Sequence, residues 1–207
     1  MGLKEMKMDL IIEKSLSLFL EKSISAITIR DIANSIDIGE ATIYRYFDNK
    51  DNIMNLCAHL LEKKVYDGYF NLKNNKSGYE MIEDFYKNYL VIFKSHPEYF
   101  KFINEYDAYL LSKMIKPSSE YEDLINKFHS LFIEIFNIGL NDKSIKPIDD
   151  IDTFYFATSK ALLELCKKEC VGFNIVSDDG SNSEKIIKRL IDISLKELKG
   201  DASKWKD

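Results

Sequence analysis

The sequence predicts an all-α protein in which an N-terminal three-helix head is joined by a long helix to a larger C-terminal helical bundle. Proline and glycine are scarce, with three and eight copies among 207 residues, while Leu, Ile, Lys and Glu are plentiful. This composition favours long helices over sheets. Apolar residues also recur every three or four positions along most of the chain, which predicts about nine helices in total.

The first two helices are predicted from apolar spacing and a capping pattern. We expect the first from Asp9 to about Glu21, with Ile12, Leu16, Phe19 and Leu20 on its apolar face. A short second helix should follow Thr28, which is a good N-cap residue with the carboxylate of Asp31 three positions later. Its apolar side is formed by Ile29, Ile32 and Ala33.

A tight turn and a third helix follow directly. Asp37 can adopt a left-handed turn conformation, and Gly39 can serve as the N-cap of a helix running from roughly Glu40 to Phe47. Ile43 and Phe47 lie four positions apart as core anchors. The other faces carry Thr42, Tyr44, Arg45 and Tyr46, side chains that contact bases and phosphates. Two short helices joined in this way have the geometry that the DNA major groove accepts.

This segment resembles the DNA-binding head of the TetR family of bacterial one-component repressors. The family pattern Thr-aliphatic-Arg-Asp-Ile-Ala appears at residues 28–33, and Thr-aliphatic-Tyr-x-Tyr-Phe-x-x-Lys appears at residues 42–50. The resemblance implies a homodimer built on the last two long helices, an operator in double-stranded DNA and a small-molecule effector bound in the C-terminal body.

Two positions depart from the residues that are usual in the family. Asp37 replaces a glycine, which is a mild change because Asp tolerates positive φ. Family members often have a Ser-Lys pair where this chain has Gly39-Glu40. The Glu40 carboxylate suits a helix N-terminus but repels phosphate. It could instead accept a hydrogen bond from a cytosine amino group. We therefore expect DNA binding to persist with an altered half-site preference.

The expected DNA contacts divide into base and phosphate contacts. Thr42, Tyr44 and Arg45 should lie nearest the bases, with Glu40 at the helix start. Phosphate contacts are expected from Thr28, Arg30, Tyr46 and Lys50. The charge balance argues for modest salt dependence, because residues 1–64 hold nine Lys and Arg against ten Asp and Glu, and the chain has a net charge of −5.

A fourth helix is predicted to start near Asn49 or Lys50 and to continue to Tyr69. It would link a helix-turn-helix DNA-binding domain, residues 1–64, to an effector-binding and dimerisation domain, residues 65–207. Five further helices are expected over residues 79–95, 98–114, 118–140, 149–171 and 183–198. Pro97 can occupy the first turn of the second of these.

The last two helices are apolar around more of their circumference than one core contact requires. This breadth favours burial on two sides, against the body and against a second copy of the chain. The alternative is a helix buried wholly inside one subunit. The residues expected at the dimer contact are Phe154, Ala161, Leu162, Leu165, Ile187, Leu190 and Ile191.

The body is dense in aromatic residues, which are either plain core or the lining of a ligand cavity. The candidates for the lining are Tyr89, Phe93, Phe102, Tyr106, Phe132, Phe136 and Tyr155. Glu105, Asp107 or Glu134 near such a cavity would suit a flat or cationic hydrophobic molecule. The same carboxylates are equally compatible with a solvated surface.

Several classes of function are not supported by any motif. Cys166 and Cys170 lie four positions apart, but a zinc site needs about four ligands and no CxxC or histidine pair completes one. There is no glycine-rich phosphate loop, nucleophile elbow or HExxH motif. No apolar run approaches the ~20 residues that span a bilayer. We expect a cytoplasmic protein without enzymatic activity, metal, cofactor or membrane partner.

The sequence therefore predicts a ligand-responsive DNA-binding transcriptional regulator. We expect a repressor that leaves its operator when a small hydrophobic or aromatic effector binds the C-terminal domain. The acidic head and Glu40 motivate an alternative, a helical ligand- or protein-binding module with a vestigial DNA-binding head. Binding to promoter DNA distinguishes the two.

Overall fold

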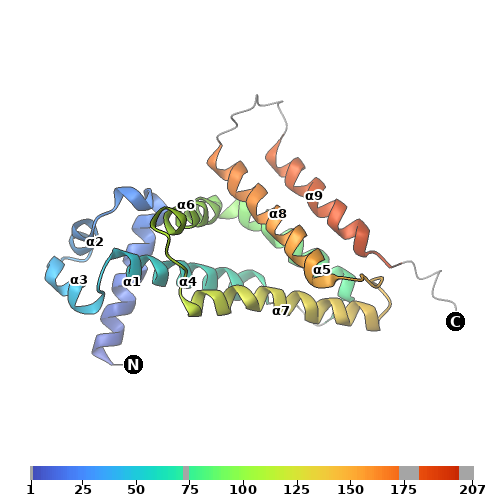
Figure 1. Cartoon of the computed structure of the whole chain (residues 1–207), viewed down its shortest axis with the longest axis horizontal. Helices are drawn as coiled ribbons and strands as arrows, with labels where there is room; N and C mark the ends of the chain where they lie inside the picture. The colour runs from blue at the N-terminus through green and yellow to red at the C-terminus, as the bar shows by residue number, and fades with distance from the viewer. Residues whose placement is uncertain (1, 72–74, 173–181, 201–207) are drawn as a thin grey trace. The chain divides into compact units, whose positions relative to one another are not determined.

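The computed structural model describes residues 2–71, 75–172 and 182–200, and this part of the chain contains nine α-helices and no β-strand (Figure 1). The all-α prediction is confirmed. The helices are α1 (Leu3–Glu21), α2 (Ile29–Ser35), α3 (Glu40–Tyr46), α4 (Lys50–Tyr69), α5 (Gly78–Ser95), α6 (Pro97–Lys113), α7 (Ser119–Asn141), α8 (Ile151–Val171) and α9 (Ser183–Leu198). A 3-10 turn, η1 (Ile24–Ala26), separates α1 from α2.

The helices begin where side chains can accept hydrogen bonds from the first free amides. Asp150 accepts from the Thr153 amide at 3.0 Å to start α8, and Asn182 accepts from the Lys185 amide at 3.2 Å to start α9. The first helix begins at Leu3, earlier than the predicted Asp9. Leu3 and Met6 in its first turns are exposed and contribute nothing to the core, and the Glu5 carboxylate accepts from the Gly2 amide at 2.8 Å to cap the start.

Contacts divide the chain into two compact units. Unit 1 consists of residues 1–65 and 101–124, and unit 2 of residues 66–100 and 125–207. Unit 1 therefore adds most of α6 and the start of α7 to the head. The division at residue 64 into a DNA-binding and an effector-binding domain stays a prediction.

The core of unit 1 joins the head helices to α4 and α6. Ile32 of α2 and Ile43 of α3 are fully buried, as is Ile53 of α4. Phe102 of α6 is also buried, and its ring centroid lies 6.4 Å from that of Phe19 in α1. Apolar burial of this kind supplies most of the stability of short helices such as α2 and α3.

The core of unit 2 is an aromatic cluster. The Phe85 ring of α5 meets the Phe70 ring at a centroid distance of 5.0 Å and the Phe132 ring at 5.4 Å, both in edge-to-face geometry. The buried Tyr86 hydroxyl shares a 2.6 Å hydrogen bond with Thr158 of α8. These pairs add directional contacts to the burial of large apolar rings.

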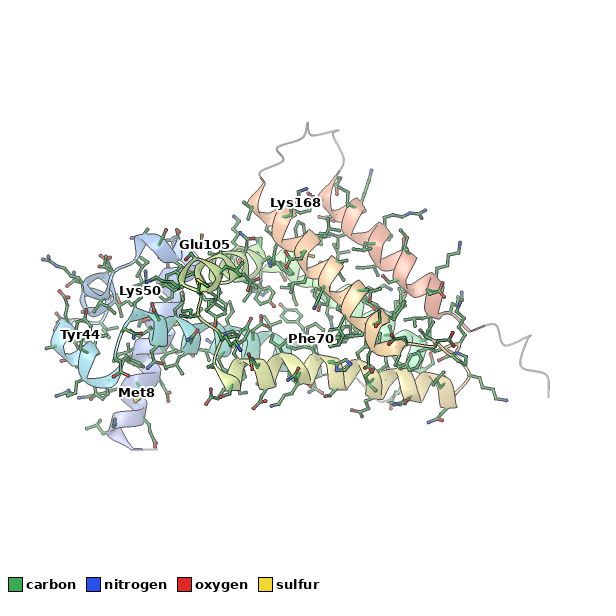
Figure 2. All side chains as sticks on the ribbon, in the orientation of Figure 1. Met8, Tyr44, Lys50, Phe70, Glu105 and Lys168 are labelled. Carbon is green, nitrogen blue, oxygen red and sulfur yellow. The ribbon has the colours of Figure 1, made fainter. Side chains whose placement is uncertain are left out.

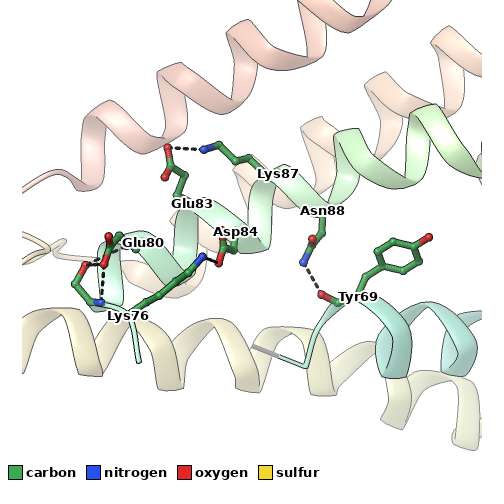
Figure 3. Close-up of polar contacts among 8 residues, drawn as sticks. Tyr69, Lys76, Glu80, Glu83, Asp84, Lys87 and Asn88 are labelled. Carbon is green, nitrogen blue, oxygen red and sulfur yellow. Dashed lines mark hydrogen bonds and ion pairs between the residues drawn. The ribbon is translucent and has the colours of Figure 1, made fainter. Parts of the chain in front are cut away.

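Two features fix the start of α5 against its neighbours. Ser77 and Glu80 form a capping box, with the Ser77 amide 2.9 Å from the Glu80 carboxylate (Figure 3). Asn88 donates to the Tyr69 carbonyl at 2.5 Å and so ties α5 to the last turn of α4 (Figure 3). At Gly78 the backbone of α5 passes so close to α7 that an added Cβ would lie 2.2 Å from the Gly139 amide nitrogen.

Candidate nucleic-acid interface

The helix-turn-helix forms as its local chemistry predicts. The Thr28 hydroxyl accepts from the Asp31 amide at 3.1 Å, and the Asp31 carboxylate accepts from the Thr28 amide at 2.8 Å. Asp37 adopts the expected left-handed conformation with φ of 55°, and the adjoining Ile38 amide donates to the Ala33 carbonyl at 3.1 Å. Gly39 is the N-cap of α3.

Helix α3 is anchored on one side and open on the other. Ile43 and Phe47 are buried within the core of the head. Tyr44 is 53% exposed and stands at the outer edge of α3 (Figure 2). The Arg45 guanidinium lies 5.2 Å from the centroid of the Tyr46 ring, which is a cation–π contact. Thr42 is partly exposed, and Glu40 is exposed at the helix start.

The candidate phosphate-contacting residues are in different environments. Arg30 is exposed at the first turn of α2. Thr28 is engaged in the capping box, and its hydroxyl also lies 2.6 Å from the Asp31 carboxylate. Hydrogen bonds from the Thr28 side chain and amide hold the pKa of Asp31 below its usual value. A phosphate contact from Thr28 stays a prediction.

Lys50 is engaged inside the head. Its ammonium donates a hydrogen bond to the Ile24 carbonyl and lies 5.8 Å from the centroid of the Phe19 ring. Burial lowers the pKa of Lys50. A phosphate contact from this residue also stays a prediction, since the ammonium would have to leave the Ile24 carbonyl to make it.

A second contact to the backbone of Ile24 comes from α6. The Glu105 carboxylate accepts from the Ile24 amide at 2.6 Å and from the Ser23 hydroxyl at 3.0 Å. Lys50 and Glu105, both labelled in Figure 2, therefore hold η1 within unit 1 through the carbonyl and the amide of Ile24, and we call these contacts the Ile24 clamp. Sequence reasoning missed this role of Glu105, because nothing in the local pattern signals a contact across 81 positions.

Tyrosine side chains of α6 also bind α4 within unit 1. The Tyr106 hydroxyl donates to Asn55 at 2.7 Å, and the Tyr109 hydroxyl donates to Asp51. Burial, and secondarily the Asp51 carboxylate, raises the pKa of Tyr109 to about 12, so this hydroxyl keeps its proton at neutral pH. Helix α6 is thus bound both to η1 and to the first half of α4.

A cavity of about 320 Å³ opens in unit 2 between the end of α4 and helices α5 and α7. Its lining consists of Tyr66, Asp67, Phe70, Asn71, Met81, Leu131, Glu134 and Ile135. None of the seven aromatic residues predicted to bind a ligand is in this lining. The structure places Phe102 and Tyr106 in unit 1 and Tyr89, Phe93, Phe132, Phe136 and Tyr155 in unit 2. A ligand contact from any of them stays a prediction.

The residues predicted at the dimer contact divide into two groups. Leu162, Ile187 and Ile191 are already buried within one chain. Phe154, Leu165 and Leu190 are partly exposed, and Ala161 is exposed. Two larger apolar side chains stand out on the same helices, Phe156 of α8 at 43% exposure and Ile193 of α9 at 55%. Periodicity alone could not tell the inward from the outward apolar positions of these helices.

No cluster of three or more His, Cys, Asp or Glu in the described ranges could hold a metal ion. Burial raises the pKa of the Cys166 thiol well above its usual range, so this group stays protonated and unreactive. Nor does any helix in the described part of the chain have the length and apolar character needed to cross a membrane.

Comparison with known proteins decides the family. Residues 11–57 match the family described as bacterial regulatory proteins, tetR family. The biofilm operon icaADBC HTH-type negative transcriptional regulator IcaR of Staphylococcus epidermidis is 30% identical over 141 residues, which cover 68% of this chain and 69% of that protein. The chain belongs to the TetR family. It is accordingly a DNA-binding transcriptional regulator and not an enzyme.

Solved structures share the TetR-family fold along nearly the whole chain. The ketosteroid transcriptional regulator KstR2 of Mycobacterium tuberculosis matches with a TM-score of 0.60 and 15% identity, covering 94% of this chain and 96% of that one. A regulatory protein of the tetR family from Rhodococcus RHA1 matches with a TM-score of 0.64 and 15% identity, covering 97% and 100%. At these identities the likeness shows the fold alone.

Proposed function

We propose that this TetR-family protein is a homodimeric repressor that binds its operator through α3 and leaves it when a small molecule occupies the C-terminal body. The observation that carries the proposal is the division of α3 into two sides. Ile43 and Phe47 fix the helix to the head, and Tyr44 and Arg45 project from it into solvent. A short helix held in this way can enter a major groove without rearrangement of the head.

The exposed side chains of α3 suit base recognition. Arg45 can donate two hydrogen bonds to guanine, and the Thr42 methyl group can contact thymine. Glu40 can accept from the amino group of cytosine, which favours a C·G pair under the start of α3. Arg30 and Tyr46 would then contact phosphates on either side, together with the amides at the helix N-termini.

The route from effector to DNA runs through helices that continue from one unit into the other. Residues 66–69 of α4 and 97–100 of α6 belong to unit 2, and the rest of both helices belongs to unit 1. Both helices bind the backbone of Ile24: Lys50 of α4 donates to its carbonyl, and Glu105 of α6 accepts from its amide. An effector that shifts either helix would displace η1 and with it the head. The coupling needed is typically about 1–3 kcal/mol.

The dimer contact would use the outward faces of α8 and α9. Phe156 and Ile193 leave large apolar surfaces in water, and the small Ala161 permits close approach of a second copy. Leu190 is partly exposed on α9 and would complete this contact. Two heads in such a dimer would read half-sites about 34–36 Å apart.

Fluorescence anisotropy on labelled DNA from immediately upstream of the gene tests the DNA-binding part of the proposal. Wild-type protein should bind this DNA more tightly than scrambled DNA of equal length. Tyr44→Ala should lower the specific affinity by at least about fivefold, since one base contact contributes about 1–3 kcal/mol. Val91→Ala, which truncates an exposed apolar residue on α5 of unit 2, is the matched control and should bind as wild type.

The alternative function, a ligand- or protein-binding module with a vestigial head, makes the opposite prediction. Its supporting observations are the exposed Glu40 and the engagement of Lys50 within the head. Equal and weak binding to upstream and scrambled DNA by wild type and Tyr44→Ala alike would favour this alternative. A selective difference between the two DNAs would exclude it.

A further inference from the structure

The cavity in unit 2 has a chemistry of its own. Phe70, Met81 and Ile135 are buried and form an apolar floor, and Leu131 adds an apolar wall. Asp67, Asn71 and Glu134 are exposed and form a polar rim. The volume of about 320 Å³ is at the lower end of the range of roughly 300–1,000 Å³ that holds small-molecule ligands.

The charged side chains of the lining are acids. The lining contains Asp67 and Glu134 and no Lys, Arg or His. Residues one turn away from Glu134 on α7, namely Ser130, Leu131, Asn137 and Ile138, are also uncharged. Within the described part of the chain, no lysine or arginine forms an ion pair with Glu134. An organic anion would therefore meet repulsion at this rim, and a cation would meet attraction.

Two aromatic rings of the cavity are held in fixed positions. The Tyr66 and Phe70 rings lie nearly parallel, with 12° between their planes and 6.5 Å between their centroids. Each also makes an edge-to-face contact with Phe128, at 4.9 Å for Tyr66 and 4.8 Å for Phe70. Burial first, and then the charges of Glu134 and Asp67, raise the pKa of Tyr66, so its hydroxyl stays neutral. Fixed aromatic faces beside carboxylates are favourable surroundings for an ammonium group.

From this arrangement we infer that the cavity is an effector site for small organic cations, with an apolar body on the Phe70 floor and an ammonium group between the Tyr66 ring and the Glu134 carboxylate. The inference rests on the proposed function for its regulatory meaning. Tyr66 and Asp67 belong to the last turn of α4, and Phe70 directly follows it; the first residue of this helix, Lys50, is part of the Ile24 clamp. A cation bound between α4 and α7 would thus act directly on a helix that reaches the head.

The test compares two probes of the same shape, benzyltrimethylammonium and its uncharged carbon analogue neopentylbenzene, binding to full-length protein by ligand-observed NMR. Glu134→Gln should weaken binding of the ammonium probe about three- to fivefold, as expected for one partly solvated charge pair. The same substitution should leave binding of the uncharged probe within about twofold. Tyr66→Leu, which keeps an apolar side chain but removes the ring, should weaken the ammonium probe about two- to fivefold.

Glu122→Gln is the matched control, because it removes an exposed carboxylate of α7 about 18 Å along the helix from Glu134. Thermal melting of each variant shows whether it is folded. Loss of both probes to the same extent in Glu134→Gln, equal losses in Glu122→Gln, or no binding of the ammonium probe to wild type would overturn the inference.

A parallel anisotropy experiment on operator DNA separates this inference from the proposed function. Protein that binds the operator but not the ammonium probe retains the proposed function and refutes the cation site. Protein that binds the ammonium probe in a Glu134-dependent way but binds no DNA keeps the site and refutes the repressor. The cation site and the repressor function are both supported if the ammonium probe lowers operator affinity in wild type and not in Glu134→Gln at the same probe concentration.

Discussion

Removal of the Glu105 carboxylate should loosen the head from α6. In the structure this carboxylate accepts from the Ile24 amide at 2.6 Å and from the Ser23 hydroxyl at 3.0 Å. Glu105→Ala leaves the Ile24 amide without that acceptor. A hydrogen bond to a charged group contributes about 1.5–3 kcal/mol to stability, so the free energy of unfolding should fall by about that amount. Glu105→Gln keeps a neutral acceptor and should cost about half as much.

The assay combines urea unfolding with amide hydrogen exchange. The Ile24 amide should exchange faster in Glu105→Ala, because its acceptor is gone, while amides in unit 2 keep their wild-type rates. Glu122→Ala, an exposed carboxylate in the same unit, is the control and should change stability by no more than about 0.5 kcal/mol. If Glu105→Ala behaves like Glu122→Ala in both measurements, the Ile24 clamp does not hold the head to α6.

Further predictions concern packing, pH and assembly. Gly78→Ala should lower the free energy of unfolding, measured by urea melts, by at least about 2 kcal/mol, because the added Cβ would lie 2.2 Å from the Gly139 backbone. Gly68→Ala is the control and should be neutral or stabilising, because a Cβ at Gly68 has no atom within 4 Å. The lowered pKa of Asp31 contributes stability that is complete above the ordinary pKa of 3.8, which the residue has in the unfolded chain, and is lost as pH falls through the folded-state pKa. Unfolding midpoints should therefore fall more steeply below about pH 4 in wild type than in Asp31→Asn, and equal slopes would contradict this. Phe156→Glu should convert the dimer to monomer in sedimentation at micromolar concentration, whereas Val91→Glu, equally exposed on another helix, should not; a monomeric wild type would contradict the dimer.

The parts of the fold that sequence could predict are those fixed by neighbouring residues. The capping box of Thr28 and Asp31, the left-handed Asp37 and the N-cap at Gly39 all depend on positions within a few residues. The bounds of α9 follow from a strong apolar period and a polar start. Local capping and periodicity therefore predicted the helix-turn-helix and most of the helices beyond it.

The parts that sequence could not predict depend on contacts between distant segments. The sequence is compatible with a Glu105 carboxylate near a ligand or in solvent, whereas in the structure it accepts from the Ile24 amide of the head. For Lys50 the sequence predicts a phosphate contact, which stays a prediction, but gives no sign of the hydrogen bond that its ammonium donates to the Ile24 carbonyl. The cavity is lined by Tyr66 of α4 and by Phe70 just beyond this helix, and no sequence pattern marks either residue as lining a cavity. Such roles follow from which helices pack together, and a periodic pattern does not specify that.

Selection of bound genomic DNA by the purified protein tests the central claim, that α3 reads an operator, most directly. The wild type should enrich fragments that share an inverted repeat with half-sites about one helical turn apart, and Tyr44→Ala should enrich none of them. Glu40→Gln should still enrich an inverted repeat but with a changed base preference under the start of α3. Enrichment of the same fragments by wild type and Tyr44→Ala, or of no shared sequence by either, would contradict the account.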